Sequence, residues 1–126
     1  MDLRPATSDD HAAIRGLLRD SRLPVEDLDT AAIDFIVACE GGVLAGVVGV
    51  EAFEGAGLLR SLAVRGDQRG RGLGGRLVEA IEARAAARGM TQLVLLTETA
   101  APFFARRGYA DIAREQAPVA VQSSTE

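Results

Sequence analysis

The sequence contains no lysine, tryptophan or asparagine, and it has a single cysteine and a single histidine. Without lysine, the chain offers neither a Schiff-base nucleophile of its own nor the Gly-Lys-Ser/Thr motif of a P-loop protein. Cys39 has no second cysteine for an intrachain disulfide, and one Cys with one His cannot build a Cys/His zinc site. We therefore expect no metal site, and a Ser-His-Asp triad would have to use His11.

Long apolar runs are missing as well. The longest apolar stretch without a charge, residues 41–50, is too short and too rich in glycine to span a bilayer, and residues 1–5 do not resemble a signal peptide. We therefore expect a cytoplasmic protein that does not enter a membrane. The 126 residues carry a formal net charge of −4 and are 48% hydrophobic. This balance predicts one folded domain and argues against a general nucleic-acid-binding surface.

The apolar residues that are present follow helical and strand periods in turn, which predicts an α/β fold on a mixed sheet (an α+β arrangement). We expect residues 1–114 to form a single domain and residues 115–126 a tail. A first helix is predicted between Thr7 and Pro24, and Gly41-Gly42 is predicted to be a hairpin turn. The predicted strands are 3–6, 35–40, 43–53, 58–64, 92–97 and 109–114, and the further helices are 25–33, 70–88 and 99–107.

Glycine and arginine gather in one segment, Val64-Arg65-Gly66-Asp67-Gln68-Arg69-Gly70-Arg71-Gly72-Leu73-Gly74-Gly75-Arg76. The segment falls between a predicted strand and a predicted helix, where unpaired N–H groups and the helix dipole favour a bound anion. Four interpretations fit such a segment: a glycine-rich turn with solvated arginines, a dinucleotide fingerprint, an RGG-type nucleic-acid segment, and the pyrophosphate loop of an acyl-CoA site. The upstream hairpins and the negative net charge weigh against the second and third.

The run Arg69-Gly70-Arg71-Gly72-Leu73-Gly74 resembles the R/Q-x-x-G-x-G/A signature of the GNAT N-acetyltransferases, and it follows a strand that ends Ser61-Leu62-Ala63-Val64. The order of elements is similar along nearly the whole chain. A finer resemblance is to the small acetyltransferases of arsenic-resistance operons and to the acetyltransferase domain of N-acetylglutamate synthases. It rests on strand 58–64, the run Leu95-Leu96-Thr97-Glu98-Thr99-Ala100-Ala101 and the pair Phe103-Phe104.

The resemblance implies acetyl-CoA as cosubstrate and transfer of its acetyl group to the amine of a small molecule, an amino acid or an analogue. The amine would attack the thioester directly, so no covalent nucleophile is required. The backbone of strand 58–64 would pair with the pantetheine arm and polarise the thioester carbonyl. The implied cofactor-binding residues are Leu62, Ala63, Val64, Arg69, Gly70, Arg71, Gly72, Leu73, Gly74 and Gly75.

The general base is less well indicated. Glu51 and Glu98 lie late in their strands on the expected acceptor side, with Glu54 as a third option in a turn. Taken singly, each is more typical of a solvated carboxylate at a strand end than of a base. Members of the family often carry a tyrosine in the penultimate helix as the general acid. Phe104 stands there in this chain, so we expect water to protonate the thiolate. Tyr109 aligns with a core aromatic residue.

Arg60 stands out as a charge in the middle of a predicted central strand. Strict alternation would place Leu58, Arg60, Leu62 and Val64 on one face of the sheet. A charge placed there should be paired or functional. It would either bind the carboxylate of an amino-acid acceptor, aided by Thr97 and Thr99, or form a structural ion pair with Glu51 or Glu98.

The C-terminal residues depart from the family pattern, because residues 117–122 make a poor closing strand with Pro118 inside it. Either the closing strand is short and irregular, or a partner chain such as a second copy covers the gap, or the chain is truncated. The absent tyrosine and this irregular end support a second hypothesis, a non-catalytic acyl-CoA-binding or assembly module. A nucleotide-binding oxidoreductase is a distant third.

Overall fold

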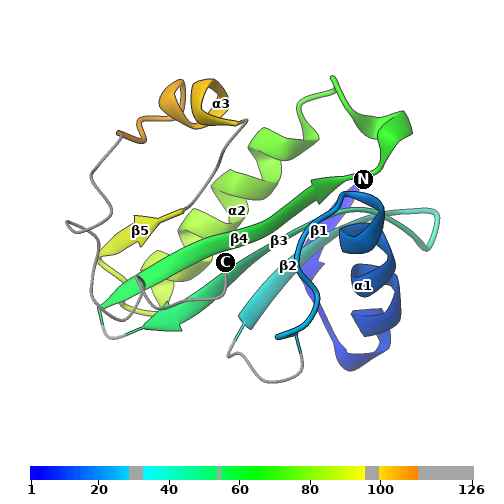
Figure 1. The fold of residues 1–126 in the computed structure, drawn as a ribbon, viewed down its shortest axis with the longest axis horizontal. Helices are drawn as coiled ribbons and strands as arrows, with labels where there is room; N and C mark the ends of the chain where they lie inside the picture. Colours follow the sequence, from blue (N-terminus) through cyan, green and yellow to red (C-terminus); the bar gives the residue numbers. More distant parts are fainter. Residues whose placement is uncertain (29–32, 54, 96–99, 111–126) are drawn as a thin grey trace.

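A computed structural model describes residues 1–28, 33–53, 55–95 and 100–110. Within them, five strands form one sheet in the order β1-β2-β3-β4-β5 (Figure 1). The pairs β1–β2, β2–β3 and β3–β4 are antiparallel, and β5 is parallel to β4. The elements are β1 Asp2–Pro5, η1 Ser8–Asp10, α1 His11–Asp20, β2 Ile33–Glu40, β3 Val43–Phe53, β4 Ala56–Val64, η2 Gly66–Gln68, α2 Leu73–Ala87, β5 Gln92–Val94 and α3 Ala101–Ala105.

The two long helices bury opposite faces of the sheet. Neighbouring residues of β3 show this directly, because Val47 packs in the cluster that includes Ile14 and Leu18 of α1, whereas Val48 packs with Leu77 of α2. Successive side chains of a strand point to opposite faces, so a continuous apolar run is what a doubly covered strand requires. The mixed α/β architecture predicted from the sequence is confirmed.

Several local predictions are also confirmed. β3 has the predicted bounds, and Gly41 and Gly42 both have positive φ, +58° and +82°, in the hairpin turn that precedes it. β4, α2 and β5 form the predicted crossover between parallel strands. Gly89 ends α2 with φ +83°, a conformation that glycine adopts without strain.

The predicted helix 25–33 is wrong where the structure describes it. Val25 has no regular secondary structure, residues 26–28 form a turn, and Ile33 already begins β2. The reason is a contact distant in sequence: the Asp27 carboxylate binds Arg60 of β4, which draws this segment toward the sheet. In η1, by contrast, Thr7 donates its N–H to Asp10 Oδ2 at 2.7 Å, as in a capped helix start.

The remaining bounds differ by a few residues at element ends. α2 begins at Leu73 rather than at residue 70, β5 covers only Gln92–Val94 of the predicted 92–97, and α3 covers Ala101–Ala105 of the predicted 99–107. Residues 109 and 110 are not in a strand, and the rest of the predicted strand 109–114 lies outside the described residues, as does the tail.

A β-bulge interrupts β4. Val47 of β3 pairs with Ala63 and Gly49 pairs with Arg60, so Val48 faces two residues, Ser61 and Leu62. Ser61 has φ +59° although it is not a glycine and is only 2% exposed. An extra residue in one strand shifts the side-chain alternation beyond it to the other face.

The bulge therefore overturns the expected common face of Arg60, Leu62 and Val64. Leu62 and Val64 pack in the cluster of α2, while Arg60 bonds to Asp27 on the side of α1. Nothing in the sequence marks this bulge, because no glycine occupies the left-handed position.

Candidate active site

Among the described residues, β5 pairs with only part of the neighbouring edge of β4. The two strands pair at Ala56–Gln92, Gly57–Leu93 and Leu58–Val94. Beyond Leu58, no further β5 residue pairs with β4 within the described ranges, so backbone groups of β4 past this point are left to other partners. The bulge at Ser61 and Leu62 lies in this unpaired half. A ligand with amide groups could complete the edge as an added strand does.

The glycine turn (residues 65–75) follows β4. Gly70 and Gly72 both have φ +79°, and a Cβ at either position would meet no atom within 4 Å. Gly72 is the N-cap of α2, and Arg76 donates the first intrahelical N–H bond, to the Gly72 carbonyl at 3.2 Å. The N–H groups of residues 73–75 consequently have no acceptor within the helix. These amides, together with the open space beside Gly70 and Gly72, fit a phosphate group.

Arginines surround this turn. Arg65 pairs with Asp67 at 2.5 Å, and this lowers the pKa of Asp67. Arg69 Nε donates to the carbonyl of Val64 at 3.1 Å, which closes the turn against the end of β4. Arg76 Nη2 donates to the carbonyl of Met1 at 3.3 Å. Among the described residues, Arg69 and Arg76 form no ion pair with a carboxylate, so their charges add to the positive end of α2.

Arg60 is held by two carboxylates. Its Nη1 and Nη2 donate to the two oxygens of Asp27 at 2.6 and 2.8 Å, and Nη1 also donates to Glu51 Oε1 at 3.0 Å. Its Nε donates to Ser61 Oγ at 3.2 Å, and the side chain has no exposed surface. Hydrogen bonds from Arg60 are the main cause that lowers the pKa of Asp27. A bidentate contact of this kind fixes both partners.

These contacts favour the structural interpretation of Arg60 and confirm its predicted contact with Glu51. The sequence did not single out Asp27, although a buried arginine in a strand implies a carboxylate partner somewhere. Four other residues considered at the site, Glu54, Thr97, Glu98 and Thr99, lie outside the described residues. Within the described ranges, the structure thus connects Glu51 to the bulge through Arg60 and Ser61.

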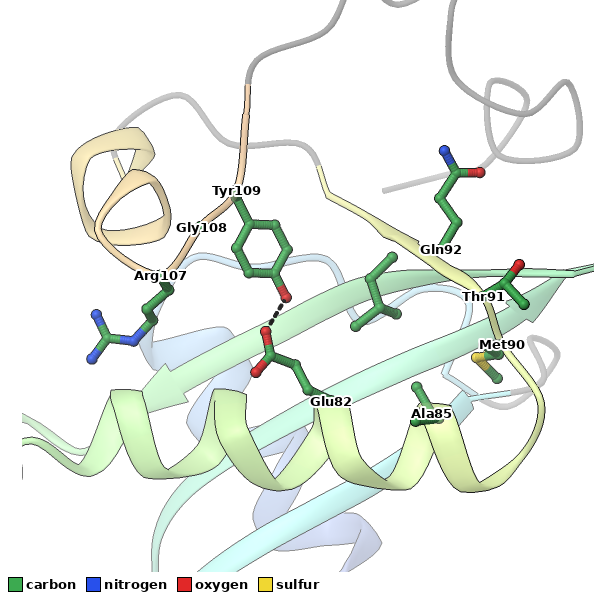
Figure 2. A pocket seen from close by; sticks show the side chains of 10 residues that line it. Glu82, Ala85, Met90, Thr91, Gln92, Arg107, Gly108 and Tyr109 are labelled. Carbon is green, nitrogen blue, oxygen red and sulfur yellow. Dashed lines mark hydrogen bonds between the residues drawn. The ribbon is translucent and has the colours of Figure 1, made fainter.

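A pocket of about 400 Å³ opens between the C-terminal half of α2, the start of β5 and residues 107–109 (Figure 2). Glu82 and Met90 line it, and α2 rises about 1.5 Å per residue, so Glu82 lies roughly 13 Å from Leu73. The pocket is therefore at the other end of the helix from the glycine turn. Across it, Tyr109 donates its hydroxyl to Glu82 Oε2 at 2.8 Å.

Tyr109 gives a direct test of this part of the structure, because it is the only tyrosine and the chain has no tryptophan. Burial raises the pKa of Tyr109 above its ordinary 10.0, and the bond to Glu82 with its charge raises it further. An absorbance titration at 295 nm should thus give a midpoint well above 10. Because the folded pKa is the higher one, stability should fall as the pH rises above 10. A midpoint at 10 would mean that Tyr109 is solvated.

The fold and the site define a class of protein. Within the described residues, a bulged central strand has an edge that β5 pairs only in part, and a glycine turn at a helix N-terminus follows it directly. This arrangement offers backbone amides first to an extended arm and then to phosphates. Acyl-CoA has this sequence of parts, so the arrangement fits the class of acyl-CoA-dependent transferases. The described residues contain no group of three or more His, Cys, Asp or Glu placed to hold a metal ion.

A family model described as "Acetyltransferase (GNAT) domain" matches residues 31–111, more than half of the chain. The chain belongs to the GNAT acetyltransferase family. It is an acetyl-CoA-dependent N-acetyltransferase, with acetyl-CoA as cosubstrate. Among the helices that the structure describes, none has the length and apolar character to cross a membrane.

Solved structures share the fold. N-acetylglutamate synthase from Neisseria gonorrhoeae, in complex with coenzyme A and L-arginine, matches with 24% identity and a TM-score of 0.84; the match covers 96% of this chain and 30% of that one. An acetyltransferase from Trypanosoma brucei matches with 20% identity, coverage of 89% and 94%, and a TM-score of 0.73. A predicted acetyltransferase with acetyl-CoA from Clostridium acetobutylicum matches with 13% identity, coverage of 88% and 90%, and a TM-score of 0.73.

Proposed function

We propose that this enzyme acetylates the amino group of a small molecule, an amino acid or a close analogue, by direct attack of the amine on the thioester. The observation that carries the proposal is the edge of β4 beside the bulge at Ser61 and Leu62, with which no described residue of β5 pairs. Backbone groups at this edge would hold the pantetheine arm and polarise the thioester carbonyl. Holding both reactants in place lowers the barrier without a covalent intermediate.

The side chains near the bulge support direct attack. Ser61 is buried, and its Oγ accepts a hydrogen bond from Arg60 Nε, so it is not poised as a nucleophile. Cys39 lies on β2, separated from β4 by β3. An α-amino group has a pKa of roughly 8, so a fraction of it is already neutral near pH 7 and needs only modest help from a base.

The acceptor class rests on similarity in fold and on the resemblance in sequence. The gonococcal synthase, which aligns with almost the whole chain, has been solved with coenzyme A and L-arginine and with coenzyme A and N-acetyl-glutamate. In our proposal, Thr97 and Thr99 would contact the acceptor. Arg60 would act mainly by holding Glu51, since Asp27 and Glu51 already bind its guanidinium.

Glu51 and Glu98 are the proposed general bases. Glu51 pairs with Leu58 in the sheet. It lies three residues along β3 from Val48, the residue opposite the bulge, and this separation is about 10 Å at 3.4 Å per residue. A proton would need a water molecule to cover this distance. The Glu51 side chain is 14% exposed, which leaves it accessible to such a water.

A panel assay tests the proposed acceptor. Release of CoA thiol from acetyl-CoA should depend on an added α-amino acid or on one of its phosphorus or arsenic analogues. The matched α-hydroxy acids should give no release, since they lack the amine. Turnover with larger amines such as peptides, and with no member of the panel, would contradict the amino-acid proposal. Binding of CoA without any release would instead support the non-catalytic module.

The same assay, once an acceptor is found, tests the base. Glu51→Gln keeps the size of the side chain and a hydrogen-bond acceptor for Arg60 but removes the basic group. We expect kcat to fall by about 100-fold, as for the loss of a general base, with the Kd for CoA unchanged. Glu40→Gln, at the exposed end of β2, is the control and should keep full activity. An unchanged kcat in Glu51→Gln would assign the role to Glu98 or to water alone.

A further inference from the structure

Arg107 follows α3 and extends its side chain to the first turn of α2. Its Cζ lies 4.0 Å from the ring centroid of Phe103, in a cation–π contact, and its Nη1 donates to the Phe103 carbonyl at 3.3 Å. Figure 2 shows Arg107 at the border of the pocket, with its guanidinium directed away from Tyr109. Stacking on the ring and bonding to the backbone hold the guanidinium in one place.

Two glycines of α2 make room for this pair. A Cβ at Gly75 would collide with Arg107 Nη2, and a Cβ at Gly74 would lie 3.5 Å from a ring atom of Phe103. Gly75 is also helical and has no positive φ, so backbone strain does not explain a glycine there. A glycine in a helix interior costs about 1 kcal/mol relative to alanine. The space it leaves is filled by the guanidinium of Arg107.

The charge of Arg107 is placed at the positive end of a helix. Within the described ranges no carboxylate forms an ion pair with it, and Arg71 and Arg76 belong to the same end of α2. Cations are favoured at helix C-termini, so an arginine held here is unfavourable until an anion arrives. The phosphates of acetyl-CoA are the anions that this enzyme binds. Gly75, whose N–H is one of the three without an acceptor in the helix, lies beside the same guanidinium.

We propose that Arg107 is a further CoA-binding residue, whose guanidinium contacts a phosphate group of acetyl-CoA at the N-terminus of α2. In this proposal, Gly75 leaves the space in which the Arg107 guanidinium lies. Guanidinium binds phosphate through a planar fork, and stacking on Phe103 presents that fork at little entropic cost. The proposal rests on acetyl-CoA as cosubstrate and not on which amine accepts the acetyl group.

Calorimetric titration of Arg107→Ala with CoA and with dephospho-CoA, which lacks the 3′-phosphate, tests the proposal. We expect the Kd for CoA to rise about tenfold, the size of one lost charged hydrogen bond. An equal loss of affinity for both ligands would mean that Arg107 contacts the pyrophosphate. A loss of affinity for CoA alone would mean that it contacts the 3′-phosphate. Arg106→Ala removes the same charge from the neighbouring exposed residue and should change Kd less than twofold. A similarly small change for Arg107→Ala overturns the proposal.

A double-mutant cycle tests the role of Gly75. Gly75→Ala should weaken CoA binding in the native background, because the added methyl group displaces the guanidinium. In the Arg107→Ala background the same substitution should leave Kd unchanged and should raise thermal stability, as alanine favours the helix. An equal loss of CoA affinity in both backgrounds would mean that Gly75 faces the phosphate itself, and would overturn its assignment as a seat for Arg107.

Discussion

Arg60→Met will lower the free energy of unfolding by about 3–5 kcal/mol, the cost of removing one partner from a buried ion pair. The substitution leaves Asp27 and Glu51, whose side chains are only 13% and 14% exposed, close together without their shared cation. Urea denaturation at pH 7 measures the effect. Since small domains have only about 5–15 kcal/mol of stability, the variant will be close to unfolding.

Two comparisons separate the ion pair from simple loss of packing. The triple variant Asp27→Asn, Glu51→Gln, Arg60→Met also removes the two carboxylate charges that Arg60→Met leaves without their cation, and it should recover much of the lost stability.

The stability that Arg60 contributes should also depend on pH. Arg60 lowers the pKa of Asp27 below 3.8, so the stability this pair contributes is present above pH 3.8 and is lost as the pH falls below it. The difference between the native chain and Arg60→Met should therefore shrink toward low pH. A difference that is constant with pH would assign the loss to packing alone.

Gly72→Asp will weaken CoA binding by about 100-fold while the fold survives. The new carboxylate would stand at the N-cap of α2, next to the N–H groups that fit a phosphate, and like charges so placed cost several kcal/mol. Aspartate is also a good N-cap residue and tolerates positive φ better than most side chains, so stability should change by only about 1 kcal/mol. Calorimetric titration with CoA and a thermal melt measure the two quantities.

Gly55→Asp is the matched control for this substitution. Gly55 also has positive φ, +73°, and a Cβ there would meet no atom within 4 Å. It lies in the turn between β3 and β4, at the far end of the nine-residue strand from the glycine turn. The control should therefore bind CoA as the native chain does. If Gly72→Asp bound CoA within threefold of the native chain, the N-terminus of α2 would not be the phosphate site.

The parts of the fold that follow local rules were predictable from the sequence. The paired glycines at 41 and 42 fix a hairpin turn, and the apolar run after them gives β3 its observed bounds. Likewise, the glycines that precede Leu73 mark the start of α2 within three residues. In each case the signal lies within the element itself or at its ends.

The missed features depend on contacts between distant residues. The segment 25–28 has the acidic start of a helix, but Asp27 instead binds Arg60, 33 residues away. The bulge at Ser61 depends on pairing with β3, and no glycine marks it. The space at Gly75 is occupied by Arg107, which is 32 positions further along the chain. The motif alone could therefore not distinguish a glycine that faces a phosphate from one that makes room for a side chain.

In the candidate site, too, the features with a local sequence signal were predictable and those that depend on distant contacts were not. The glycine turn was recognisable because its residues are consecutive, and the resemblance to the GNAT family rests on them. The contact of Arg60 with Glu51 was one of two interpretations, and it needed the register of β3 and β4 to be chosen. The roles of Glu51, Thr97, Glu98 and Thr99 stay predictions, and the acceptor panel is the measurement that addresses them.

The bond between Arg76 and the carbonyl of Met1 has a practical consequence for all of these titrations. It ties the first residue to the opening turn of α2, and Figure 1 shows the N-terminus beside the end of β4. A purification tag fused ahead of Met1 would extend from the surface next to the proposed phosphate site. A polyhistidine tag there would add titratable groups that attract the ligand at mildly acidic pH and obstruct it sterically at any pH. Affinities for CoA should accordingly be compared on protein from which such a tag has been cleaved.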